Sequence, residues 1–178
     1  EYEAMRRSSA SGLSDPQRYG LALARMARQP ASAVTELSDL LEQHPDNLWL
    51  ALALGQAESR SGRAAQANSR YDALLRRMPG HRAVVLTYAN VLLEQGGVQA
   101  GRRAQEVLRP LLARAGEDPV FQQAFARASE LAGDTHRAAE AYAEAAFLNG
   151  RPEQALIQLE NLKKRGDLDY VTRSRVDA

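Results

Sequence analysis

The chain has 178 residues, a formal net charge of +1 and no cysteine. It contains 32 alanines and 24 leucines but only 9 valines, 4 threonines and 1 isoleucine, too few β-branched residues for a sandwich, a barrel or a parallel sheet. Alanine and leucine favour helices, so the composition predicts an all-α fold. The lack of cysteine excludes thiolate catalysis and cysteine-ligated zinc, and the near-neutral charge argues against a dedicated nucleic-acid-binding protein. No apolar run is long enough to cross a membrane, so no direct membrane insertion is expected.

A repeat is visible from residue 48 to residue 81, which reads as a helix, a glycine turn, a second helix and a closing proline. Small residues are expected where the two helices cross closely, and large residues beside them. This order is typical of the tetratricopeptide repeat, which has a period of about 34 residues. The pattern residues are Leu54, Gly55, Gly62, Ala67, Tyr71 and Pro79.

The repeat predicts an α-solenoid of about five helix pairs, wound as a right-handed superhelix and filling residues 1–178 as a single array. Asp15-Pro16 is expected to be an N-cap and the first helical residue of the first pair. Residues 1–13 are expected to end a preceding helix and link it to the array. The predicted repeats are residues 14–47, 48–81, 82–119, 120–149 and 150–178.

Beyond residue 81 the period becomes less regular. We expect a longer turn at residues 96–99, and an interruption of the following helix at Pro110, because proline disturbs a helix interior. A helix from Arg137 to Asn149 is expected to close one pair and open the next. A last helix, from about Leu168 to Ala178, lacks a partner, so we expect the chain to be a fragment of a longer protein.

The segment from Asn149 to Tyr170, NGRPEQALIQLENLKKRGDLDY, resembles the C-terminal repeat domain of the β-barrel assembly-enhancing protease family. Members are periplasmic zinc metalloproteases of the M48 type in Gram-negative bacteria. Residues 19–24 and 41–47 are similar to the same domain, so the resemblance covers most of the chain. It implies a periplasmic, non-catalytic domain that docks on the outer-membrane protein assembly machinery and on β-barrel substrates. It also implies that the domain packs on the protease domain and restrains it.

The zinc motif of that family, His-Glu-x-x-His, is absent, and the histidines His44, His81 and His136 are not spaced as a zinc-binding helix pair. We therefore expect no metal, no cofactor and no catalytic residue in this chain. Zinc is expected only in a protease domain outside it. The histidines are interpreted as ordinary surface or turn residues.

The first helix of each repeat is expected to line a concave, protein-binding face. Trp49 and the leucines of this face are more apolar than a solvated surface needs, and amides such as Asn90 can pair with a peptide backbone. The alternative is that Trp49 and the leucines pack between repeats. Positions equivalent to a clamp for a C-terminal carboxylate hold Arg18, Ala22, Ala53, Ala83 and Thr87, which argues against such a clamp. The candidate groove residues are Arg18, Arg25, Trp49, Leu52, Gln56, Arg60, Leu86, Asn90 and Leu93.

Two functions remain open at this point: an interaction domain of the periplasmic protease, or a free-standing repeat adaptor of another bacterial envelope assembly or secretion system. A His-Glu-x-x-His motif upstream of Glu1 in the gene would distinguish them. An enzymatic function is the least favoured, because the many carboxylates lie at helix-surface spacing with arginines.

Overall fold

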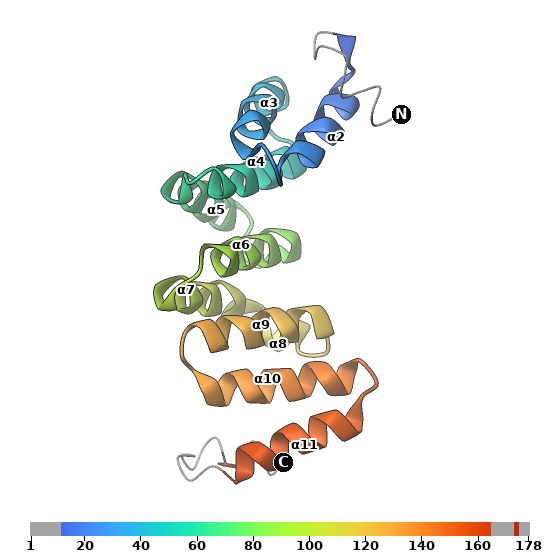
Figure 1. Cartoon of the computed structure of the whole chain (residues 1–178), viewed down its shortest axis with the longest axis vertical. Coiled ribbons are helices and arrows are strands. Elements are labelled where there is room, and N and C mark those ends of the chain that lie inside the picture. The colour runs from blue at the N-terminus through green and yellow to red at the C-terminus, as the bar shows by residue number, and fades with distance from the viewer. Residues whose placement is uncertain (1–11, 165–172, 175–178) are drawn as a thin grey trace. The chain divides into compact units, whose positions relative to one another are not determined.

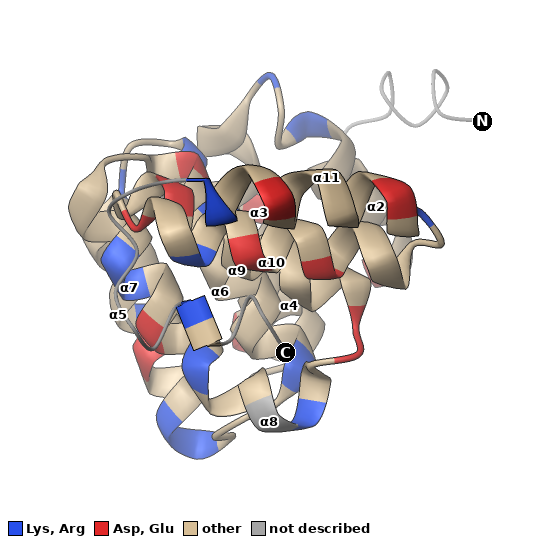
Figure 2. Cartoon of the chain, turned by 90° about the horizontal axis from the view of Figure 1, so that it is seen from below, with Lys and Arg blue, Asp and Glu red and all other residues tan. Residues whose placement is uncertain are grey.

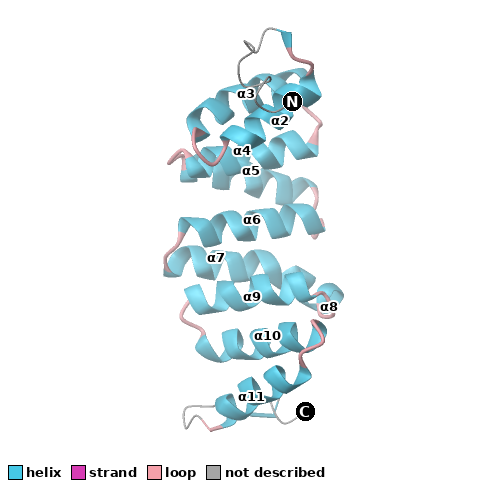
Figure 3. Ribbon diagram, turned by 45° about the vertical axis from the view of Figure 1, so that its right-hand side comes forward, coloured by secondary structure: helices cyan, strands magenta, loops and turns pink. Residues whose placement is uncertain are grey.

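The computed structural model describes residues 12–164 and 173–174. Within these ranges the chain consists of helices and short turns and contains no strand, as the composition predicted (Figures 1 and 3). The elements are α2 (Asp15–Arg25), α3 (Pro30–Gln43), α4 (Leu48–Arg60), α5 (Ala64–Arg77), α6 (Arg82–Gln95), α7 (Val98–Leu108), the 3-10 helix η2 (Arg109–Leu111), α8 (Leu112–Ala115), α9 (Pro119–Leu131), α10 (Thr135–Leu148) and α11 (Pro152–Lys163).

The chain divides into two compact units, residues 1–79 and 80–178. In the first unit each helix packs on the next, α2 on α3, α3 on α4 and α4 on α5. The core between α2, α3 and α4 is built from alanines at the helix crossings and larger apolar residues beside them, which lets the helix backbones approach closely. Its buried members are Ala22, Met26, Ala33, Val34, Leu37, Leu40, Leu50, Ala53, Leu54 and Ala57.

The first described helix starts one residue earlier than the sequence suggested. Ser14, not Asp15, is the N-cap residue of α2, and its backbone is extended at φ −69° and ψ 159°. The backbone N–H of Ser14 donates to Oε1 of Gln17 at 2.9 Å, as in a capping box. Asp15 and Pro16 therefore fill the first two helical positions, where a carboxylate and a missing N–H are both well tolerated.

Three of the described turns between helices are very short and share one geometry. At Gly62 the backbone N–H of Arg63 donates to the carbonyl of Glu58 at 2.9 Å, and the N–H of Gly62 donates to Ser59 at 3.1 Å. These two bonds define a Schellman motif, which requires the positive φ of 83° that glycine adopts readily. The same pair of bonds recurs at Gly133 and at Gly150. In each case the residue after the glycine is already the N-cap of the next helix.

In the second unit α7 packs on α6 and on α9, and α10 packs on both α9 and α11, as the half-period spacing predicted for that helix. The predicted long turn at residues 96–99 is wrong. Only Gly96 and Gly97 separate the helices, and α7 begins at Val98. The extra residues of this repeat lie after α7 instead, where Pro110 sits in η2 and interrupts the helix as expected.

Parts of the sequence interpretation fall outside the described residues. They are most of the linker at residues 1–13 and, apart from residues 173–174, the helix expected from Leu168 to Ala178. Among the helices that are described, none combines the length and the apolar character needed to span a membrane.

Candidate functional site

A groove of about 680 Å³ lies in the first unit, where the start of α2, the end of α3 and the start of α4 meet. Its volume falls in the range of about 300–1,000 Å³ that is common for ligand pockets. We call it the α2–α4 groove. It is lined by Asp15, Pro16, Tyr19, Leu40, His44, Asn47, Trp49 and Leu50.

Most of the lining is apolar. Leu40 and Leu50 are buried at its base, while 62% of Trp49 is exposed. Burial raises the pKa of Tyr19 further above its ordinary value of 10.0, so the phenol contributes no charge to the groove. The exposed fraction of Trp49 distinguishes the two interpretations of this residue, because it shows that the side chain is not part of the buried core. An exposed aromatic residue beside buried leucines is typical of a partner-binding surface.

The position of Trp49 follows from the start of α4. Asn47 is the N-cap residue, and its Oδ1 accepts hydrogen bonds from the backbone N–H groups of Trp49 at 3.0 Å and Leu50 at 3.3 Å. These bonds hold the first turn of the helix in place. Leu50 is thereby directed into the core and Trp49 into the groove.

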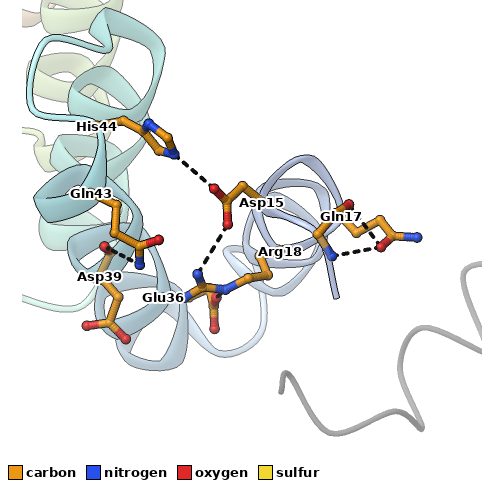
Figure 4. A network of polar contacts seen from close by, with 8 residues as sticks. Asp15, Gln17, Arg18, Glu36, Asp39, Gln43 and His44 are labelled. Atoms are coloured by element: carbon orange, nitrogen blue, oxygen red, sulfur yellow. Dashed lines mark hydrogen bonds and ion pairs between the residues drawn. The ribbon is translucent and has the colours of Figure 1, made fainter. Parts of the chain in front are cut away.

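One rim of the groove is a polar network between α2 and α3 (Figure 4). Nε2 of His44 lies 2.9 Å from Oδ2 of Asp15, and Nη1 of Arg18 lies 3.5 Å from Oδ1 of the same carboxylate. Nε of Arg18 also donates to Glu36. The hydrogen bond with His44 is the main reason why the pKa of Asp15 is lowered, and the Arg18 charge adds to it. The network therefore links the start of α2 to the end of α3.

The structure places two of the predicted groove residues at this site, Trp49 in the lining and Arg18 in the rim network. Arg25 and Gln56 are half-buried elsewhere on α2 and α4, and Arg60 is exposed at the end of α4.

Leu52 and Leu86 differ from the expectation, since they are only 4% and 8% exposed. The expectation that they are open to a partner is wrong for these two residues, and the alternative, that the leucines pack against other helices, applies because both side chains are enclosed.

The remaining predicted residues lie on α6 in the second unit. Asn90 is exposed and Leu93 is half-buried. Leu93 contributes to a separate hollow of about 440 Å³ with α9 and α10, where the hydroxyl of Tyr142 donates to Oε2 of Glu130 at 2.8 Å. Desolvation and this bond raise the pKa of Tyr142 to about 12.

Sequence reasoning missed several groove residues, above all His44, which it interpreted only as a turn residue. His44 ends α3 while Asp15 begins α2, and these helices pack as neighbours. The end of one helix and the start of the helix before it meet in an antiparallel pair, so this contact could have been inferred from the predicted helix boundaries. Within residues 12–164 and 173–174, no three His, Cys, Asp or Glu side chains are grouped so as to hold a metal ion.

No family model matches the chain, and no curated protein matches it either. The similar solved structures include the following two. The first, "MamA RS-1 ArsTM double mutant", aligns with a TM-score of 0.63 and 20% identity over 94% of this chain and 93% of that one. The second, a tetratricopeptide repeat protein from Parabacteroides merdae ATCC 43184, aligns with a TM-score of 0.56 and 16% identity over 98% of this chain and 75% of that one. The chain is thus an all-α tetratricopeptide-repeat solenoid, as its repeat pattern predicted.

Proposed function

We propose that this chain is a non-catalytic protein–protein interaction domain and that the α2–α4 groove is its contact surface. The observation that carries the proposal is Trp49, a large aromatic side chain that is 62% exposed beside buried leucines in a groove of about 680 Å³. Exposed tryptophan is energetically valuable in interfaces, because it buries a large apolar area on binding.

We propose further that the domain belongs to a periplasmic zinc metalloprotease of the M48 type. In this proposal it docks on the outer-membrane β-barrel assembly machinery and its substrates, and it packs on the protease domain. The support is the resemblance of residues 149–170 to the repeat domain of that family. The zinc ion would be held by the protease domain, and this chain would supply partner recognition alone.

A second candidate is a free-standing repeat adaptor of another envelope assembly or secretion system. One observation supports it: the alignment with the MamA structure covers 94% of this chain and 93% of that one, so that solved chain carries the same repeat fold without a further domain of comparable size. Sequencing the reading frame upstream of Glu1 separates the two candidates. A His-Glu-x-x-His motif there supports the protease, and a complete gene without it supports the adaptor.

Photo-crosslinking in the full-length protein tests the contact surface itself. A photoreactive amino acid is placed at Trp49, and at the exposed Arg102 on α7 as a control. We expect Trp49 to yield products with an envelope protein or with the protease domain of the same chain, and Arg102 to yield none. Products from Arg102 but none from Trp49 would contradict the proposal.

A further inference from the structure

We propose that the α2–α4 groove binds a short peptide segment in which a large apolar side chain is flanked by lysine or arginine. This inference rests on the proposed function, which makes the groove a contact surface, and it adds the chemistry of the partner. Two features of the groove support it: an apolar lining with exposed aromatic character, and an excess of carboxylates along one rim.

The apolar lining accepts the large side chain of the segment. Leu40 and Leu50 form its buried base, and Tyr19 and Trp49 flank it. A side chain of the size of leucine or phenylalanine that covers these residues removes apolar surface from water on both partners, which favours binding. The aromatic residues also favour a basic neighbour, because the face of an indole ring attracts a lysine or arginine cation.

The charge on the α3 side of the groove is negative. From Pro30 to Ser59 the chain contains no lysine or arginine, whereas α3 carries Glu36 and Asp39 beside the rim network. Both signs of charge are present on other helices of the chain (Figure 2). The α3 side therefore attracts cations in a way that the overall net charge of +1 does not reveal.

The rim network leaves this negative charge only partly neutralised. Arg18 is shared between Asp15 and Glu36, so one guanidinium faces two carboxylates. Asp39 makes no ion pair with any other residue that the structure describes, and its side chain is exposed beside the network (Figure 4). A basic side chain of a bound segment gains attraction here, whereas an acidic segment meets repulsion from Asp39 and finds Arg18 already engaged.

Intrinsic fluorescence offers a direct measurement, because Trp49 is the chain's single tryptophan and lines the groove. Three synthetic peptides of equal length are titrated into the full chain. The first carries a central Leu-Phe pair flanked by lysines, the second has glutamates in place of the lysines, and the third keeps the lysines but replaces Leu-Phe by serines. We expect the first peptide to change Trp49 emission and to bind about tenfold more tightly than either of the others.

Asp39→Asn tests whether the charge of this carboxylate contributes to peptide binding, and it breaks no ion pair within the part of the chain that the structure describes. We expect it to weaken binding of the lysine-flanked peptide by about two- to fivefold, in line with one exposed charge pair. Glu153→Gln, at an exposed site on α11, changes the net charge by the same amount and is expected to leave binding unchanged. Added salt should weaken the binding of the peptide with lysines around Leu-Phe more than the binding of the peptide with glutamates.

Several outcomes would overturn the inference. Equal binding of the lysine-flanked and glutamate-flanked peptides would remove the charge preference while leaving the groove as a contact surface. If no peptide alters Trp49 emission but Trp49 still crosslinks to a protein partner, the proposed function stands and this inference fails. A Trp49 crosslink to a second copy of the chain, with a dimer in sedimentation, or to residues 1–11 of the same chain would assign the groove to another occupant.

Discussion

A Cβ atom at Gly55 would lie 2.6 Å from Cε2 of Tyr71, a distance at which no side chain fits. Gly55 lies on α4 and Tyr71 on α5, so this contact sets how closely the pair crosses. The Tyr71 ring is fully buried, and its hydroxyl donates to the carbonyl of Leu52 at 2.7 Å. The ring is therefore held by the helix that carries Gly55 and has little freedom to move aside.

Gly55→Ala should destabilise the first unit. The added methyl group forces the Tyr71 ring or the helix to shift, which costs about 1–3 kcal/mol for overpacking of a core. Urea denaturation followed by circular dichroism measures the change. Gly20→Ala is the matched control, since a Cβ atom there meets nothing within 4 Å. Gly20→Ala should stabilise α2 by about 0.5–1 kcal/mol through helix propensity. Equal effects of the two substitutions on the free energy of unfolding would contradict the close contact between Gly55 and Tyr71.

Gly101→Ala should be more damaging than Gly55→Ala. A Cβ atom at Gly101 would lie 2.5 Å from the backbone N of Ala132 and 2.7 Å from the carbonyl carbon of Leu131. Backbone atoms cannot rotate out of the way as a side chain does, so α7 and α9 must separate. We expect a loss of about 3 kcal/mol or more in the free energy of unfolding. Arg102→Ala, at an exposed neighbouring position, should change it by less than about 0.5 kcal/mol.

Removing Arg70 should destabilise the chain through Glu58. The Glu58 side chain is buried, and Arg70 binds both of its oxygens, with Nε at 2.9 Å and Nη2 at 2.7 Å. Arg70→Ala leaves a buried carboxylate unpaired, for which we expect a cost of about 2–3 kcal/mol, since Arg70 is partly exposed. Arg77→Ala removes a partner from the exposed Asp46 at 3.6 Å and should cost less than about 0.5 kcal/mol. If chemical denaturation shows similar losses in the free energy of unfolding for Arg70→Ala and Arg77→Ala, the buried pair is no more important to stability than the exposed one.

His44→Ala should raise the pKa of Asp15 towards its ordinary value of 3.8, because the hydrogen bond from His44 is the main cause of the lowered value. A carboxyl group whose pKa is lowered by folding stabilises the fold above its unfolded pKa, and the contribution disappears as pH falls through the folded pKa. The stabilisation of the folded chain by the Asp15–His44 hydrogen bond should therefore be complete above about pH 4 and lost in more acidic solution. Carboxyl carbon NMR titration measures the shift. Gln43→Ala is the control: Gln43 donates to the Asp39 carbonyl and not to Asp15, so this substitution should leave the pKa of Asp15 unchanged.

Trp49→Ala combined with Asn90→Ala should weaken partner binding and leave the helical circular dichroism intact. Both side chains are exposed, so their truncation removes little packing within the chain. A Leu52→Ala variant is the contrasting case, since Leu52 is buried and its truncation should cost about 2–5 kcal/mol. Loss of helical signal in the Trp49 and Asn90 double variant would instead show that these residues support the core.

The helix boundaries were largely predictable because the residues that end helices act locally. Glycine with positive φ at Gly62, and proline at Pro110, produce a turn or an interruption whatever surrounds them. The turn at residues 96–99 was misjudged because Val98 and Gln99 have no such local constraint. Their helical state depends on how α7 packs on its neighbours.

Exposure on the expected binding face could not be predicted from the repeat phase. Trp49 and Leu52 both lie on α4, yet 62% of Trp49 is exposed and only 4% of Leu52. Periodicity assigns residues to faces of one helix, but burial depends on which neighbouring helices cover each face. Two of the predicted apolar groove residues were therefore enclosed, and His44 and Tyr19 joined Trp49 in the lining without having been selected.

The sequence by itself determined that this chain is helical, repetitive and closed at its turns by glycine and proline, since these properties arise from backbone preferences over a few residues. Only the tertiary structure decided that the start of α2, the end of α3 and the start of α4 enclose a groove, and that Asp15, Arg18, Glu36 and His44 form one network on its rim. The reason is that such contacts join residues up to 29 positions apart, which meet only when the helices have packed.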